Sequence, residues 1–197
     1  MWGYSIDYWG IVDYCCNTKN LYTMKKMIID QAHSEIGFKV KHLMISTVKG
    51  NIGTFSGGVD EDGTVNVSMN LNSINTGNLD RDNHLKSADF FNVEEYPVMT
   101  FNGAMTEDMT EVVGEITIKG VTKQITLDVD YNGTSVDPWG NTKHGWEMTG
   151  SINRSDFGLT WNAPLDTGGV LVSEEVKLNI DLQMMEVVEE METMSAQ

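Results

Sequence analysis

Apolar and polar residues alternate along most of the chain from residue 27 onward. In "VNVSMNL" (65–71), for example, every second residue is apolar. A period of two places successive side chains on opposite faces of a β-strand. Within 48–59 the phase slips by one residue at Gly53–Thr54, which indicates a bulge or bend. The pattern predicts eight strands, each with one apolar and one polar face: 36–42, 48–59, 65–71, 99–105, 112–118, 125–131, 146–152 and 176–184.

These strands predict an all-β fold, an eight-stranded antiparallel barrel. Strands with polar outer faces cannot carry helices on both sides of a sheet, which excludes a parallel α/β fold. Closing long antiparallel strands removes exposed edges, and eight strands enclose a space that is filled by side chains or holds one small ligand. Four glycines share the phase of the inward residues, and they either leave volume for a ligand or mark bends of the barrel: Gly50, Gly103, Gly114 and Gly150.

The alternation stops at "RDNHLKSADFF" (81–91), where charged residues lie beside two phenylalanines. Residues 80–88 suit a short helix with Asp80 as its N-cap. Two acid–base pairs with a spacing of four residues would support it, Asp82 with Lys86 and Asp80 with His84. We interpret the segment as a helical lid over one end of the barrel. The residues expected to face the cavity are Leu85, Phe90 and Phe91.

A catalytic interpretation of the same segment makes His84 a general base that Asp80 or Asp82 orients. The chain has no nucleophile motif such as G-x-S-x-G beside it, and no reactive cysteine in the patterned region. The histidines and carboxylates lack metal-ligand spacing, and the adjacent Cys15 and Cys16 form no disulfide framework. We therefore expect no catalytic residue, no metal and no cofactor.

A second irregular stretch, 152–176, contains Arg154 and Asp156, which are close enough to pair across a turn. Its apolar residues form either a plug at the barrel end or a wall of the ligand entrance, to which Gly168 and Gly169 would give mobility. His42 lies in phase with the inward residues of the first strand. It is either a satisfied core or rim residue or a hydrogen-bond partner for a ligand.

The formal net charge is −16, from 13 Lys and Arg against 29 Asp and Glu. Because nucleic-acid phosphates require clustered basic residues, no nucleic acid is expected as a partner. The charge also disfavours electrostatic docking on anionic membrane surfaces. No apolar run approaches the ~18 residues of a transmembrane helix. We expect a soluble protein without stable membrane insertion.

Both ends of the chain lack the strand pattern. Residues 1–26 have Asp7 and Asp13 within their apolar part and their lysines last, unlike a secretory signal peptide. We expect this segment to be a non-domain extension and the protein to be cytoplasmic. Residues 187–197 form an acidic tail that is expected to fray or to form a short solvated helix. The domain is therefore predicted to span 27–186.

With these features in view, four segments resemble the YceI-like family of bacterial lipid- and polyisoprenoid-binding proteins. They are "DQAHSEIGFKVKHLMISTVKGNIGTFSG" (30–57), "RDNHLKSADFFNVEEYPVMTF" (81–101), "VVGEITIKGVTKQITLDV" (112–129) and "INRSDFGLTWN" (152–162). The resemblance implies a lipocalin-like barrel with a helical segment over its opening and a long isoprenoid or fatty chain in its apolar channel. Members are often dimers, which implies a homodimer, and many relatives are periplasmic. The implied channel residues are Phe38, His42, Met44, Arg81, His84, Leu85, Phe90, Phe91, Phe101 and Trp161.

The sequence thus predicts a non-enzymatic protein that sequesters or transports one amphipathic long-chain molecule. Polyprenyl compounds, isoprenoid quinones, fatty acids and their amides all fit the expected channel. Two alternatives stay open. One is an enzyme that acts on a bound lipid through His84, and the other is a filled barrel that acts through its surface as a stress-related interaction module.

Overall fold

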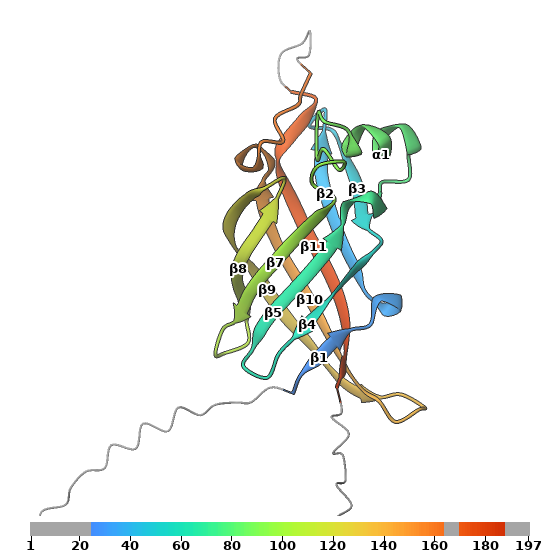
Figure 1. The fold of residues 1–197 in the computed structure, drawn as a ribbon, viewed down its shortest axis with the longest axis vertical. Coiled ribbons are helices and arrows are strands. Elements are labelled where there is room, and N and C mark those ends of the chain that lie inside the picture. The colour runs from blue at the N-terminus through green and yellow to red at the C-terminus, as the bar shows by residue number, and fades with distance from the viewer. Residues whose placement is uncertain (1–24, 164–169, 188–197) are drawn as a thin grey trace, which may run out of the picture.

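The computed structural model describes residues 25–163 and 170–187, which form a closed antiparallel β-barrel (Figure 1). The described part contains an α-helix, α1 (Leu79–Lys86), and 3₁₀ turns at Gln31–His33, Leu71–Ser73 and Arg154–Phe157. The strands are β1 (Met27–Ile29), β2 (Glu35–His42), β3 (Ser46–Ile52), β4 (Phe55–Val59), β5 (Thr64–Asn70), β6 (Ile74–Asn75), β7 (Val98–Met105), β8 (Glu111–Ile118), β9 (Val121–Val136), β10 (Thr142–Asn153) and β11 (Val172–Glu186).

The barrel closes because two bent pairs of strands each act as one long strand. A 3₁₀ turn separates β1 from β2, and Gly53–Thr54 separates β3 from β4. β11 pairs with β2 over its first part and with β1 at its end, and β1 pairs in turn with β4. Counted in this way, eight antiparallel strands complete the ring through β5, β7, β8, β9 and β10. The predicted eight-stranded barrel and the bend at Gly53–Thr54 are confirmed.

The connection between β5 and β7 carries α1 and lies beside the end of the barrel where β2 meets β3 (Figure 1). At the other end of β3, Asn51 and Ile52 pair with β6, which precedes the helix. None of the helices in the described part of the chain has the length and apolar character to cross a membrane. The helical insertion predicted between the third and fourth strands is therefore present at one end of the barrel.

The local chemistry of α1 differs from the prediction. The helix begins at Leu79 because Asn78 is its N-cap and accepts a hydrogen bond from the Arg81 amide at 3.0 Å. Asp82 is buried and accepts hydrogen bonds from the amide and hydroxyl of Thr76, at 2.9 and 2.6 Å. The predicted N-cap at Asp80 and the predicted pairing of Asp82 with Lys86 are wrong. The carboxylate of Asp82 instead fixes the turn that precedes the helix.

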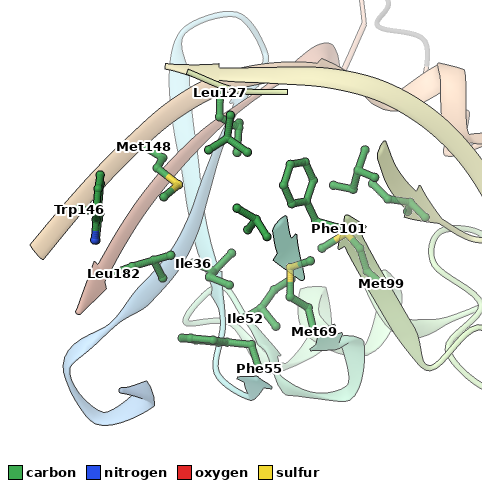
Figure 2. Packing of buried hydrophobic residues seen from close by; sticks show 14 of the residues in the cluster. Ile36, Ile52, Phe55, Met69, Met99, Phe101, Leu127, Trp146, Met148 and Leu182 are labelled. Atoms are coloured by element: carbon green, nitrogen blue, oxygen red, sulfur yellow. The ribbon is translucent and has the colours of Figure 1, made fainter. Parts of the chain in front are cut away.

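The inward faces of the strands supply the core. Buried residues alternate with exposed or half-buried ones along β7, β8, β9 and β10, as period two requires, and side chains from different strands point into the barrel (Figure 2). Figure 2 shows Phe101, Met99 and Met69 on one side and Trp146, Met148 and Leu182 on the other. Residues with essentially no exposed surface include Leu71, Val112, Phe157 and Met184.

The four inward-phase glycines neither leave empty volume nor break the strand register. A Cβ on Gly114 would lie 2.7 Å from the Phe101 ring, and one on Gly103 would lie 2.9 Å from the same ring. A Cβ on Gly150 would meet Leu127 at 2.7 Å, and Gly50 is covered by the ring of Phe38. Strand pairing continues through all four positions. These glycines make room for large neighbouring side chains to lie against the backbone.

A polar network joins neighbouring strands near the end of the barrel opposite α1. Oδ2 of Asp30 accepts hydrogen bonds from Lys143 and Gln183 and pairs with His33, each at 3.0 Å. The hydrogen bond from Lys143 is the largest cause that lowers the pKa of Asp30 from 3.8 to about 2. Nearby, Glu186 accepts from His144 at 3.0 Å. This network ties β11 and β10 to the start of the first long strand.

Candidate ligand-binding site

Three neighbouring cavities run through the barrel from α1 towards the opposite end. The first, which we term the mouth chamber, has a volume of about 350 Å³ and lies between α1, β2 and β3. The middle chamber has a volume of about 120 Å³ and shares walls with the mouth chamber at Phe38, Leu85 and Phe90. The deep chamber, of about 70 Å³, shares walls with the middle chamber at Ile36, Ile116 and Leu178. The shared walls show that the three chambers lie in a row, in the order mouth, middle and deep.

The chemistry of the walls changes along this row of chambers. All side chains around the deep chamber are apolar, from Ile29 and Val59 near one end of the barrel to Met99 and Leu178. The middle chamber is apolar except for Arg154. Polar side chains gather around the mouth chamber, namely His42, Thr76, Asp80, Arg81 and His84. The site therefore suits a molecule with a polar end at the mouth and an apolar remainder inside.

Aromatic rings from three segments pack together at the mouth. The ring of His84 on α1 lies edge-on to Phe90 at 5.0 Å and to Trp161 at 4.7 Å, and Phe90 lies 5.3 Å from Trp161. Nε2 of His84 is also 3.2 Å from a carboxylate oxygen of Asp89. These contacts hold the helical segment against the 158–163 segment and place Phe90 between the mouth and middle chambers.

Arg81 is positioned by the same turn that Asp82 fixes. Its Nε donates to the Thr76 hydroxyl at 2.7 Å and its Nη2 to the Thr76 carbonyl at 2.9 Å. The fork-shaped guanidinium has five N–H donors, so two contacts leave donors for a third group. Arg81 thus presents a positive charge in the wall of the mouth chamber.

Arg154 is 5% exposed and supports the loop on the far side of the mouth. Its guanidinium donates to the carbonyls of Ser173 at 2.9 Å, Trp161 at 2.8 Å, Val172 at 3.3 Å and Leu159. Burial lowers the pKa of Arg154, and the charge of Glu174 opposes that effect. The expected pair with Asp156 is not formed, because backbone carbonyls occupy the guanidinium instead.

Comparison with known proteins places this barrel in a family. A family model described as the YceI-like domain matches residues 28–184. The chain belongs to the YceI-like family. A UPF0312 protein of Staphylococcus aureus (strain N315) is 42% identical over 163 residues, covering 78% of this chain and 94% of the relative. A UPF0312 protein of Staphylococcus epidermidis (strain ATCC 35984) is 44% identical over 165 residues, with the same coverage.

Solved structures support the family fold. The YceI protein of Campylobacter jejuni is 36% identical and superposes with a TM-score of 0.64, covering 81% of this chain and 97% of that one. A polyisoprenoid-binding domain from Saccharophagus degradans, implicated in plant cell wall breakdown, is 18% identical with a TM-score of 0.65, covering 83% of this chain and 100% of that one. At that identity the second likeness shows the fold alone.

Nine of the ten predicted site residues of this YceI-like barrel line a cavity. His42, Arg81, His84 and Trp161 line the mouth chamber. Phe38, Leu85 and Phe90 line both the mouth and the middle chamber, Phe91 lines the middle chamber, and Phe101 lines the deep chamber. Met44 lines none of the three, and it is 64% exposed in the turn between β2 and β3. Contact of these residues with a ligand stays a prediction.

The sequence pattern does not single out the residues that connect the YceI-like chambers. Ile36, Ile116 and Leu178 are ordinary members of apolar strand faces in the sequence, and the pattern carries no signal that separates a lining residue from a packed one. The expected pairing of Asp80 with His84 is wrong, since His84 pairs with Asp89. The described residues contain no group of three or more His, Cys, Asp or Glu side chains able to hold a metal ion.

Proposed function

We propose that this protein binds one amphipathic molecule with a long apolar tail, without changing it chemically, and either stores or carries it. The observation that supports the proposal is the gradient of wall chemistry, with polar side chains around the mouth chamber and apolar walls further in. Such a row of chambers accepts a linear tail and keeps the polar end of the ligand near water. Isoprenoid compounds and fatty acids or amides both have this form.

Transfer of the tail from water supplies the affinity. Burial of each methylene contributes about 0.8 kcal/mol, so a tail that fills the inner chambers reaches high affinity with few polar contacts. Ordering a flexible tail offsets part of this gain. At the mouth, His42, Arg81 and His84 surround the place for the polar end. The binding of polyisoprenoid by the structurally similar domain of Saccharophagus degradans is consistent with this use of the barrel.

The position of His84 supports binding rather than catalysis. Its ring packs edge-on against Phe90 and Trp161, and its Nε2 faces Asp89. These contacts give the imidazole a role in closing the mouth over an apolar tail. A His84→Gln variant is expected to retain lipid uptake within about tenfold, because a hydrogen-bonding side chain of similar length is kept.

The proposal is tested by identifying the cargo and its uptake. The purified protein is extracted with organic solvent, the extract is analysed by mass spectrometry, and the stripped protein is titrated with a fluorescent fatty acid. We expect one class of long-chain lipid in the extract and binding at a one-to-one ratio. Protein that carries no lipid and takes up no fatty or isoprenoid probe after stripping would contradict the proposal.

A further inference from the structure

The turn between β2 and β3 presents three consecutive apolar side chains to solvent. Leu43, Met44 and Ile45 are 36%, 64% and 84% exposed. The amide of Leu43 donates to the carbonyl of Leu171 at 2.8 Å, and Leu171 lines the mouth chamber. The three side chains, which we term the rim tip, therefore lie at the edge of the opening into the barrel. Leu79, 73% exposed at the start of α1, adds apolar surface at the same end.

The backbone of the rim tip is also unusual for its residues. Leu43 and Met44 both have positive φ, 54° and 61°. Glycine and asparagine favour this left-handed region, whereas a residue with a bulky side chain is disfavoured there. An Asn-Gly pair would suit such a turn better for folding alone. Exposure to water and the positive φ angles both disfavour leucine and methionine at positions 43 and 44. Their presence in spite of this cost indicates that the two side chains have a function.

A row of lysines runs across the barrel wall below the rim tip. Lys39 on β2 lies directly opposite Lys177 on β11 and Lys49 on β3, and Lys41 follows two residues nearer the tip. Like charges placed opposite each other on neighbouring strands are destabilising. Among the residues that the structure describes, none of these lysines lies within ion-pair distance of a carboxylate. The cluster is therefore available to an anionic partner.

Acidic residues form the corresponding row nearer the end of the barrel opposite α1. Asp130, Glu147, Asp181 and Glu35 face one another in turn across β9, β10, β11 and β2. Glu174 and Glu175 precede the lysine row on β11 and reduce its charge locally. Because charges are screened beyond about 8 Å at physiological salt, Lys41, two residues before Leu43, contributes most to the field at the rim, and the acidic row, which lies beyond the lysine row, contributes least. The overall charge of −16 thus does not describe the field at the mouth.

We propose that the rim tip docks on the surface of a lipid bilayer that contains anionic lipids. The apolar side chains enter the interface, the lysine cluster faces the headgroups, and the mouth chamber opens towards the membrane. Short apolar insertions combined with nearby basic residues give reversible binding rather than stable insertion. This docking goes beyond lipid binding in the barrel and does not depend on which cargo the chambers hold.

Co-sedimentation with vesicles tests the proposal on the full chain. The probe is a vesicle of mixed phosphatidylcholine and phosphatidylglycerol, and the comparison is a vesicle of phosphatidylcholine alone. The key variant is L43N/M44G. It removes two apolar side chains and introduces residues that favour the positive φ angles of this turn. We expect it to lose at least tenfold in binding while its melting temperature stays equal to or above that of the wild type. The matched control is Trp139→Ser, which removes an 84% exposed side chain from the β9–β10 turn at the opposite end.

A second variant tests the charges. Substitution of Lys39, Lys41 and Lys49 by glutamine is expected to weaken binding to the mixed vesicles by about fivefold per lysine. Equal binding of the wild type to both vesicles would overturn the role of anionic lipid. Equal binding of L43N/M44G and the wild type would overturn the role of the rim tip. Sedimentation velocity supplies the last outcome: if L43N/M44G dissociates a dimer and vesicle binding is unchanged, the rim tip is an interface between copies and the proposal is wrong.

Discussion

A larger side chain between the middle and deep chambers provides a graded test of the lipid-binding site. Leu178 lines both chambers and is only half-buried although it faces inward, because its surface borders the cavity. In Leu178→Phe the added ring atoms enter this space and separate the deep chamber from the rest. Overpacking of a full core costs about 1–3 kcal/mol, and the adjoining cavity places this change at the low end.

The effect on binding follows from the length of tail that the variant excludes. Each methylene kept out of the deep chamber loses about 0.8 kcal/mol, so exclusion of four methylenes weakens binding by ~3 kcal/mol, or roughly 200-fold. Ligands too short to reach the deep chamber lose nothing. The wild type and Leu178→Phe are therefore expected to bind short chains equally and to diverge as the chain lengthens.

The assay is displacement of a fluorescent probe by a homologous series of saturated fatty acids. The matched control is Thr149→Phe, since Thr149 is exposed on the outer face of β10 at the same level of the barrel. We expect Thr149→Phe to follow the wild type at every chain length. A loss for Leu178→Phe that is the same for short and long chains would refute the order of the chambers inferred above.

Three further predictions concern stability. Arg154→Met removes the donor to four backbone carbonyls and is expected to lower the free energy of unfolding by about 3 kcal/mol, as measured in urea. The lowered pKa of Asp30 gives stability that is present above pH ~4 and is lost as the pH falls towards 2. Above pH ~4 the wild type is expected to be more stable than Asp30→Asn by about 1–2 kcal/mol, after allowance for solvent screening. Acid unfolding curves should show this difference vanishing between pH ~4 and 2. Gly114→Ala places a Cβ 2.6 Å from Gly103 Cα and 2.7 Å from the Phe101 ring, so its thermal unfolding should show a loss of about 1–3 kcal/mol, whereas an unchanged melting temperature would contradict the packing described here.

The barrel was predictable because its strands are amphipathic along their whole length. Period two identifies strand and face together, and even the bend at Gly53–Thr54 appears as a phase slip. The three-residue β1 and two-residue β6 are too short to show a period, so they were missed. Residues 1–24, 164–169 and 188–197 lie outside the described residues, and so do the interpretations made for Gly168, Gly169 and the two ends of the chain.

The site was predictable only at its edges. The interruption around α1 identified Leu85, Phe90 and Phe91 because they depart from the strand pattern, and all three line a chamber. The roles of Asp82 and Arg154 were not predictable, since both depend on backbone atoms of turns whose geometry the sequence does not reveal. For the same reason the sequence left open whether Gly114 leaves volume or marks a bend, whereas in the structure the ring of Phe101 lies over it.

A crystal structure of the protein purified with its cargo tests the central claim most directly. We expect continuous elongated density that begins beside Arg81 and His84, passes Phe38 and Leu85, and ends among the apolar side chains near Met184. Such density in protein that releases a long-chain lipid on extraction would establish the barrel as a lipid-binding site. Side chains packed across all three chambers, with no space left for a tail, would contradict it.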